Sequence, residues 1–289
     1  MIYDFDQRPR RRNTESFKWR TYADDVLPMF VADMDFVSPE PVVHALRAAV
    51  EHGNFGYPRG LHREASEVPE YAQLIVKRMA DRYDCRIQPE DVIFLPGIVV
   101  GLNIAGNMFR GADGALVIQP PIYPPFLGVA DTLGFARRDA GLIYRADGTY
   151  AMDEDRLEDA FTPDTRLFIL CNPHNPVGRV YRRAELERVA EICLARGVTI
   201  CSDEIHSDLI YRGQQHLPIA SLDPEIAQHT ITLLGPSKTF NLPGLQAAAA
   251  IVQNAELRQR FKAARQGLVP WVNLLGLIAL EAAYRDGQE

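Results

Sequence analysis

From residue 92 onward, short runs of consecutive apolar residues alternate with longer segments, most of which have helical periodicity. The apolar runs span residues 92–95, 115–118, 167–170, 198–201, 231–234 and 247–252. A strand that is apolar throughout is buried on both faces of its sheet, and helices between such strands allow them to run parallel. The pattern therefore predicts an α/β fold with a mainly parallel sheet covered by helices.

The predicted helices are marked by their ends as well as by their periodicity. Ser38-Pro39 is a typical helix start with proline at the first helical position, and this helix should run to about His52 and stop at Gly53. Further helices are predicted over residues 67–83, 184–196 and 270–284, and the last should leave a broad apolar surface uncovered. Residues 1–37 are irregular and mixed in charge.

Composition narrows the class of protein. The 289 residues are 47% hydrophobic and 24% charged, which suits one large or two smaller domains. The formal net charge of -7 gives no broad attraction to nucleic acids or anionic membranes, and no apolar run is long enough to span a bilayer. The four cysteines show no CxxC pairing. We expect a cytoplasmic protein without a nucleic-acid or membrane partner.

Candidate chemistry lies in the loops after the apolar runs, because ligands of open α/β sheets bind beyond the carboxyl ends of the strands. Lys238 follows the run at 231–234 and is bracketed by Ser, Thr, Pro and Gly. Burial there can lower the pKa of its amine and free it to attack a carbonyl group. The other loops carry a possible anion-binding helix start, an aromatic ring, an amide and a carboxylate: Gly97-Ile98-Val99, Tyr123, Asn175 and Asp203.

Several other chemistries lack their motifs in this sequence. Gly101 to Gly106 have the glycine spacing of a phosphate-binding loop, but Asn107-Met108 stands where Lys-Ser/Thr is required. No GxGxxG follows a strand, and Glu204-Ile205-His206 is not the HExxH of a zinc protease. The GxSxG elbow of a serine hydrolase is also absent. We therefore expect neither a nucleotide loop nor a metal site.

Taken together, the loops place an amine, a carboxylate, an amide, an aromatic ring and an anion-binding helix start at one edge of the predicted sheet. Pyridoxal phosphate (PLP) needs such a set. It requires a lysine for the Schiff base, a carboxylate that keeps the pyridine nitrogen protonated, and a donor to its phenolate oxygen. The sequence thus predicts PLP as the cofactor.

Three blocks of the sequence resemble the signature blocks of the class I/II (fold type I) aminotransferase superfamily. They are residues 175–178 (NPVG), 202–206 (SDEIH) and 237–244 (SKTFNLPG). Residues 32–36 (ADMDF), 56–58 (GYP), 172–176 (NPHNP) and 203–208 (DEIHSD) resemble one branch of it, the cystathionine beta-lyase-like carbon–sulfur lyases of the MalY/PatB type. The resemblance runs from about residue 30 to 285 and implies a PLP-dependent transferase-like large domain.

The resemblance implies a role for each matching residue near the cofactor ring. Lys238 would carry PLP as an imine, and Asp203 would pair with the pyridinium nitrogen. Asn175 would bind the phenolate oxygen, with His206 close to it. Tyr123 would stack on the ring.

It also implies how the phosphate is held. The amides of Gly97, Ile98 and Val99 would bind it together with Ser237. Tyr57 would reach the phosphate of the neighbouring subunit, which implies a homodimer with shared active sites.

Two residues near the lysine depart from the superfamily pattern. Gly235 stands three residues before Lys238, where relatives often have a phosphate-binding serine. Gln246 stands eight residues after it, where aminotransferases carry an arginine, and this favours the lyase branch.

The length of the chain is a further departure. Relatives continue into a small domain that carries an arginine for the substrate carboxylate, and we expect most of that domain to be missing here. Without this arginine, we expect weak PLP binding and slow turnover. Arg59 would be the carboxylate anchor only if these 289 residues proved as efficient as an extended form. Residues 1–45 would form the N-terminal arm and part of the small domain. Residues 46–289 would form the large PLP-binding domain and the start of the helix that leads to the absent part.

The reaction that the resemblance implies is α,β-elimination on a sulfur amino acid such as cystathionine or cysteine, which yields a thiol, pyruvate and ammonia. Lys238 would act as the base at the α carbon and as the acid toward the leaving sulfur. A PLP-dependent aminotransferase is the alternative, because transamination begins with the same proton removal. A second alternative is a truncated PLP-binding protein with little catalysis.

Overall fold

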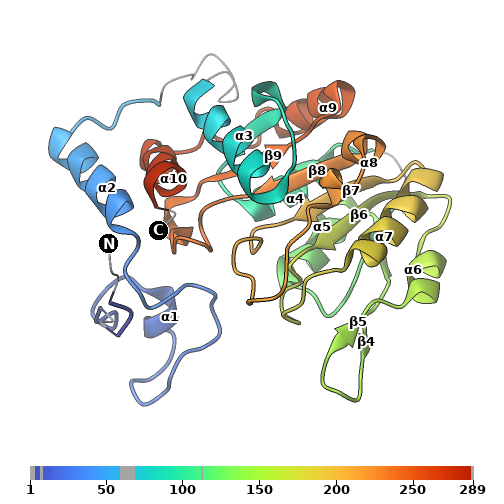
Figure 1. Cartoon of the computed structure of the whole chain (residues 1–289), viewed down its shortest axis with the longest axis horizontal. Helices are drawn as coiled ribbons and strands as arrows, with labels where there is room; N and C mark the ends of the chain where they lie inside the picture. Colours follow the sequence, from blue (N-terminus) through green and yellow to red (C-terminus); the bar gives the residue numbers. More distant parts are fainter. Residues whose placement is uncertain (1–3, 7–8, 59–68, 112, 288–289) are drawn as a thin grey trace.

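The computed structural model describes residues 4–6, 9–58, 69–111 and 113–287 (Figure 1). Its helices are α1 (Phe17–Arg20), α2 (Glu40–His52), α3 (Pro69–Tyr83), α4 (Ile98–Asn107), α5 (Leu127–Leu133), α6 (Glu154–Ala160), α7 (Arg183–Ala195), α8 (Pro224–Gln228), α9 (Ala255–Arg265) and α10 (Leu274–Asp286). Its strands are β1 (Val92–Leu95), β2 (Ala115–Ile118), β3 (Ala136–Asp139), β4 (Ile143–Tyr144), β5 (Tyr150–Ala151), β6 (Thr165–Cys171), β7 (Thr199–Asp203), β8 (Thr230–Leu234) and β9 (Ala248–Ile251).

Seven strands form one sheet in the order β1-β9-β8-β7-β6-β2-β3. The strands from β8 to β3 pair in parallel, whereas β9 runs antiparallel to both of its neighbours, β8 and β1. Because two antiparallel steps restore the direction, β1 points the same way as β8. The loops after β1, β2, β6, β7 and β8 therefore leave the same edge of the sheet. The predicted α/β fold with a mainly parallel sheet is confirmed.

The core lies on both faces of this sheet, because successive side chains of a strand point to opposite faces. Val92 and Phe94 of β1 pack in a cluster with α2, α3 and α10, whereas Ile93 and Leu95 pack with α4, α5 and α9. A third cluster joins Phe168 of β6 to α6, α7 and α8. Each fully buried large apolar side chain stabilises the fold by about 2 kcal/mol. Such double burial requires the continuously apolar strands found in the sequence.

All six apolar runs are strands in the structure, but three further strands were not predicted. β3 (Ala136–Asp139) has the sequence ARRD, lies at the edge of the sheet and is mostly exposed. β4 and β5 form a hairpin with only two residues on each side. Edge strands tolerate charged side chains because one side of the strand faces solvent. They therefore lack the apolar run by which the central strands were identified.

The helix that was predicted from Ser38-Pro39 forms, but its start differs from the expectation. It ends before Gly53, whose φ of 74° is left-handed, as predicted. Its N-cap residue is Pro39, and no side chain caps it. Ser38 instead donates its hydroxyl to the backbone oxygen of Asn241 at 3.1 Å. The predicted helix at 67–83 is α3, while residues 67–68 and Arg59 lie outside the described residues.

The last helix is partly covered along its apolar side. It begins at Leu274, because the side chain of Asn273 accepts the Gly276 N–H at 2.7 Å and caps the helix. Leu277 and Leu280 are buried in the cluster that includes α2 and α3. Of the apolar residues expected on the uncovered surface, Leu280 is buried, Leu274, Leu275 and Ile278 are half-buried, and Trp271 is exposed. The apolar surface over residues 270–284 is therefore partly covered.

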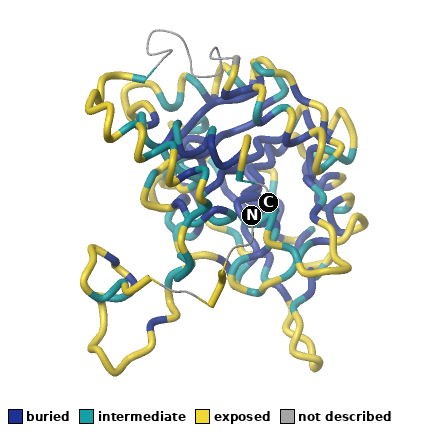
Figure 2. Tube along the Cα trace, turned by 60° about the vertical axis from the view of Figure 1, so that its left-hand side comes forward, coloured by how far each residue is buried: buried dark blue, intermediate teal, exposed yellow. Residues whose placement is uncertain are grey.

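Residues 9–39, which precede α2, form an arm that projects from the rest of the molecule and is mostly exposed (Figure 2). Several of its large apolar side chains face solvent, namely Phe17, Tyr22, Leu27, Met29 and Phe30. Along the described chain, no helix combines the length and the apolar character needed to cross a bilayer.

Candidate active site

Lys238 lies in a tight loop that follows β8 at the carboxyl edge of the sheet. The loop is fixed by its own backbone, because the Phe240 N–H donates to Pro236 O at 2.9 Å and the Leu242 N–H donates to Ser237 O at 2.9 Å. Phe240 and Leu242 are buried and anchor the loop in the core. The backbone hydrogen bonds and the two buried apolar side chains thus hold Lys238 in a fixed position.

The amine of Lys238 is partly buried and points toward the N-terminal segment. Its Nζ donates to the backbone oxygen of Ala32 at 3.2 Å. Burial lowers the pKa of Lys238, while the carboxyl groups of Asp33 and Asp203 act in the opposite direction. A lowered pKa increases the fraction of neutral amine, which is the form that attacks carbonyl groups.

Asp203 ends β7, the neighbouring strand, and its carboxyl group is buried. Its Oδ1 accepts the Ile205 N–H at 3.0 Å, and the described residues place no hydrogen-bond donor on Oδ2. Burial raises the pKa of Asp203 to about 7, with a further increase from Glu204, against the opposing effects of the Ile205 amide and of Lys238. A buried carboxyl with one free oxygen can bind a cationic group inside the site.

Asn175 and His206 line a cavity of about 460 Å³, together with Ala32, Arg179 and Tyr211. Both backbone groups of Asn175 are hydrogen-bonded, because its N–H donates to Cys171 Sγ at 3.4 Å and its oxygen accepts the Tyr123 N–H at 3.0 Å. Burial lowers the pKa of His206, and the charge of Lys238 lowers it further, so its imidazole is neutral at pH 7. The cavity therefore combines an amide and a neutral imidazole close to the lysine.

The start of α4, where the sequence predicts an anion site, leaves the same edge of the sheet. Gly97 is its N-cap residue, and no side chain caps the helix, so the first backbone N–H groups, including those of Ile98 and Val99, are free. The φ of Gly97 is 170°, which is ordinary extended backbone, and a Cβ added there would meet nothing within 4 Å. Open space thus lies next to the free N–H groups.

Close packing explains three further glycines near the site. A Cβ on Gly101 would lie 2.8 Å from a methyl group of Leu233, and one on Gly106 would lie 2.6 Å from Leu133, so these glycines let α4 approach β8 and α5. A Cβ on Gly235 would lie 3.1 Å from Ala247 O. The expected serine at position 235 would therefore crowd β9.

The two tyrosines of the predicted site occupy different places. Tyr123 is 41% exposed and its N–H donates to Asn175 O at 3.0 Å, so that its loop adjoins the lysine cavity. Tyr57 is 84% exposed and lines a separate hollow between α2 and α10, beside His52 and Ile278. The structure brings Lys238, Asp203, Asn175, His206 and Tyr123 to one edge of the sheet, but it does not bring Tyr57 to the lysine cavity of the same chain.

A buried ion pair contacts the loop that carries Lys238, and the sequence did not predict it. Asp208 forms an ion pair with Arg78 of α3, and it accepts the Tyr83 hydroxyl at 2.7 Å and the Thr239 hydroxyl at 2.8 Å. Arg78 also stacks on the ring of Tyr284 at 4.5 Å. Burial raises the pKa of Asp208, but the charge of Arg78 and these hydrogen bonds outweigh it and keep the pKa low. Thr239 follows Lys238 directly, so this contact fixes the loop.

A second buried network lies beside Asp203. Glu204 accepts the Ser202 hydroxyl at 2.9 Å and pairs with His216 Nε2 at 2.9 Å. All three residues are buried. Because Ser202 and Glu204 flank Asp203 in the chain, these contacts fix the backbone that carries its carboxyl group.

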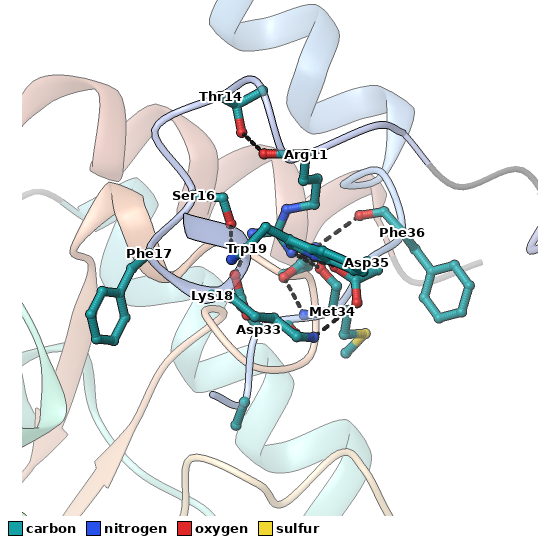
Figure 3. A network of polar contacts seen from close by, with 12 residues as sticks. Arg11, Thr14, Ser16, Phe17, Lys18, Trp19, Asp33, Met34, Asp35 and Phe36 are labelled. Atoms are coloured by element: carbon teal, nitrogen blue, oxygen red, sulfur yellow. Dashed lines mark hydrogen bonds and ion pairs between the residues drawn. The ribbon is translucent and has the colours of Figure 1, made fainter. Parts of the chain in front are cut away.

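A third network holds the N-terminal segment beside the lysine (Figure 3). Asp35 accepts the indole N–H of Trp19 at 2.6 Å, Arg11 Nη1 at 2.7 Å and Lys18 Nζ at 2.9 Å. Asp33 forms an ion pair with Arg11. The block at 32–36 signalled that these aspartates matter, but nothing in the sequence signalled their partners.

PLP fits the residues at this edge. The free Oδ2 of Asp203 suits a protonated pyridine nitrogen, and the open start of α4 suits a phosphate group. The partly buried amine of Lys238 suits an imine to the aldehyde carbon.

Comparisons with known proteins agree with this arrangement. The sequence matches the profile of the family described as aminotransferase class I and II over residues 29–289. Cystathionine beta-lyase PatB of Bacillus subtilis (strain 168) is 40% identical over 292 residues, which cover 98% of this chain and 73% of that protein.

Two solved structures have the same fold over nearly the whole of this chain. The crystal structure of OvoB superposes with a TM-score of 0.92 and 42% identity and covers 99% of this chain and 74% of that one. The PLP-bound C-S lyase from Staphylococcus hominis superposes with a TM-score of 0.89 and 32% identity and covers 99% and 72%. The described fold is that of these proteins, and roughly a quarter of each relative has no counterpart in these 289 residues.

Proposed function

Because the chain belongs to the class I and II aminotransferase family, we propose that it is a PLP-dependent carbon–sulfur lyase. Its substrates are sulfur amino acids of the cystathionine or cysteine type. The reaction breaks the bond between the β carbon and sulfur, consumes one water, and yields a thiol, pyruvate and ammonia. Cystathionine would thus yield homocysteine, and cysteine would yield hydrogen sulfide.

The observation that carries this proposal is the pairing of a partly buried Lys238 with a buried Asp203 that has one free oxygen, in a chain similar to a cystathionine beta-lyase. Gln246 supports lyase chemistry over transamination. It is exposed and has a left-handed backbone at the position where aminotransferases carry an arginine.

When bound, PLP supplies an electron-withdrawing ring that accepts the negative charge that develops at the substrate α carbon. Asp203 would hold the protonated pyridine nitrogen, and a cation beside its carboxyl would favour the ionised form of that carboxyl. Asn175 donates its side-chain amide to the phenolate oxygen, and the neutral imidazole of His206 lies beside it. Tyr123 covers the ring.

The remaining residues hold the phosphate and move the protons. The free N–H groups of Gly97, Ile98 and Val99 bind the phosphate together with the hydroxyl of Ser237. Lys238 takes a proton from the α carbon and donates one to the leaving sulfur. Since one amine does both, it must lie within reach of two substrate atoms, and its flexible stem allows this.

Incubation with cystathionine tests the reaction. The purified chain with PLP should release thiol and pyruvate in equal amounts, while Lys238→Ala should release neither. In a separate reaction, an amino acid and a 2-oxo acid are supplied together. Formation of a new amino acid there, without thiol release from cystathionine, would replace the lyase assignment with an aminotransferase.

We also propose a homodimer in which Tyr57 reaches the phosphate in the partner subunit's site. Its 84% exposure and its separation from the lysine cavity of its own chain support this. Mixing inactive Tyr57→Phe and Lys238→Ala chains should restore part of the activity, because one of the two hybrid sites is intact. If proven subunit exchange restores none, the site is not shared.

Two further features remain proposals. The four cysteines are free and buried, and burial raises the pKa of each thiol, which suits a reducing compartment such as the cytoplasm. The division into an arm with part of a small domain at 1–45 and a large domain at 46–289 is a proposal as well.

A further inference from the structure

Asn241 lies three residues after Lys238, and its side chain joins the lysine loop to a segment about 200 residues earlier in the chain. Its Oδ1 accepts the Met34 N–H at 2.9 Å. Its Nδ2 donates to Met34 O at 3.1 Å and to Phe36 O at 2.9 Å. Both ends of the amide are therefore used, and all three bonds go to the backbone of this one segment.

The backbone conformation of Asn241 does not by itself explain the side chain. Its φ of 57° is left-handed, a region that glycine adopts at no steric cost and that asparagine tolerates. Glycine would therefore serve as well if only the turn mattered. The three side-chain hydrogen bonds are what asparagine adds.

The segment that Asn241 holds is the one that contacts the lysine. Ala32 lies two residues before Met34, and its backbone oxygen accepts a hydrogen bond from Lys238 Nζ at 3.2 Å. Ala32 also lines the cavity that contains Asn175 and His206. Two side chains of one loop, Lys238 and Asn241, thus bind neighbouring backbone groups of the same segment.

The other side of the segment is attached to the arm. Asp35 is bound by Trp19, Lys18 and Arg11, and Asp33 pairs with Arg11 (Figure 3). These partners belong to the projecting, mostly exposed arm, whereas Asn241 belongs to a loop anchored in the core. Among the described contacts, the segment is attached to the sheet edge by the three side-chain bonds of Asn241, by the Ser38 hydroxyl on Asn241 O and by Lys238 on Ala32 O.

We propose that Asn241 is a positioning residue that fixes Met34 to Phe36 and thereby holds the Ala32 carbonyl against the Lys238 amine. Ala32, which lines the cavity beside Asn175 and His206, is held in place by the same contacts. The role of Lys238 rests on the proposed function, whereas the hydrogen bonds of Asn241 are made by this chain's own residues.

Three variants of the full chain test this proposal. Asn241→Gly keeps the left-handed backbone and removes the side chain. Asn241→Asp keeps the acceptor for the Met34 N–H but replaces the two donors. Asn254→Ala is the matched control, because Asn254 also accepts one backbone N–H, that of Leu257 at 3.0 Å, but it does so at the start of α9.

Two measurements without PLP report on how firmly the Asn241 side chain holds residues 34–36. Amide hydrogen exchange gives the protection of Met34, and labelling with trinitrobenzenesulfonate followed by peptide mapping gives the reactivity of Lys238. Asn241→Gly should speed Met34 exchange at least tenfold and increase Lys238 labelling severalfold. Asn241→Asp should lie between it and wild type, and Asn254→Ala should leave both unchanged.

Unchanged Met34 exchange and Lys238 labelling in a folded Asn241→Gly chain would overturn the proposal. If that variant does not fold, Asn241→Asp decides in the same way. The proposed function is tested by a different result. Failure of PLP to attach to Lys238 in the wild type would remove the enzyme assignment. It would leave the two cofactor-free measurements valid.

Discussion

The sheet edge and the N-terminal arm meet at Lys238, but they are held in place by different forces. At the sheet edge, strands that are buried along their whole length place a few polar groups such as Asp203. In the arm, large apolar side chains such as Leu27 and Met29 face solvent, and charged contacts to Asp33 and Asp35 hold the chain. Burial therefore fixes the position of the reactive groups at the sheet edge, whereas a polar network fixes the N-terminal segment that faces them.

The largest effect is expected for Lys238→Ala, at the point where the two regions meet. Turnover should fall by on the order of 10³-fold or more, because the variant loses both the nucleophilic amine and the acid–base group. The folded state should persist, because Lys238 is not part of the core. Pyruvate release and thermal unfolding measure the two properties.

Lys77→Ala serves as the control for this variant. Lys77 forms an exposed ion pair with Asp81 on α3. The turnover of the Lys77→Ala variant should match that of wild type. Retention of more than a tenth of the activity by Lys238→Ala would contradict the role of this lysine.

The second prediction concerns the sheet edge alone. Asp203→Asn should reduce turnover by about a hundredfold, because a neutral amide cannot stabilise a charged ring nitrogen. The variant keeps the shape of the side chain, so some bound PLP should remain. Turnover near that of wild type would refute the role of Asp203.

The same variant has a defined effect on stability without cofactor. The pKa of Asp203 is about 7 in the folded state against an ordinary value of 3.8, so the folded state binds this proton more tightly than the unfolded state. Its contribution is therefore present below pH 4 and is lost as the pH rises to about 7. Asp203→Asn cannot ionise, so between these pH values it should gain on the order of 3 kcal/mol relative to wild type. Parallel stability curves, measured by denaturant unfolding from pH 4 to 8, would contradict this.

A pair of glycines separates binding from packing at the sheet edge. Gly97→Ala places a methyl group in open space, so stability should change by less than about 0.5 kcal/mol while PLP affinity falls. Gly101→Ala places one against Leu233 and should cost about 1–3 kcal/mol in unfolding free energy. Thermal unfolding and PLP titration of both variants measure these effects. If both variants behave alike, the start of α4 is not an anion site.

The smallest effect is expected in the arm. Trp19→Phe removes the hydrogen bond to Asp35 and should lower the protection of residues 33–35 from hydrogen exchange. Global stability should change by less than about 1 kcal/mol, since the arm contributes little to the buried core. Loss of cooperative unfolding would show that the arm is part of the core after all.

The fold could be predicted, and the residues proposed to bind the cofactor ring could be selected, because their signals are local. Six strands are continuous apolar runs, and Asp203, Asn175 and Lys238 each follow one of them. The edge strand β3 could not be found in this way, because its charged residues carry no apolar run.

Support from distant residues could not be predicted either. Asp208 and Thr239 are 31 residues apart, and Asn241 and Met34 are 207 apart. No periodicity links such pairs, since their contact depends on how the completed sheet places the loops. The start of α2 is an example, because Ser38 binds Asn241 instead of capping its own helix.

The most direct test of the central claim is the chemical location of the cofactor. The purified chain is incubated with PLP, reduced with borohydride, digested and mapped by mass spectrometry. The account predicts a pyridoxyl label on Lys238 in wild type and in Lys77→Ala. A label on another lysine, or none at all, would contradict it.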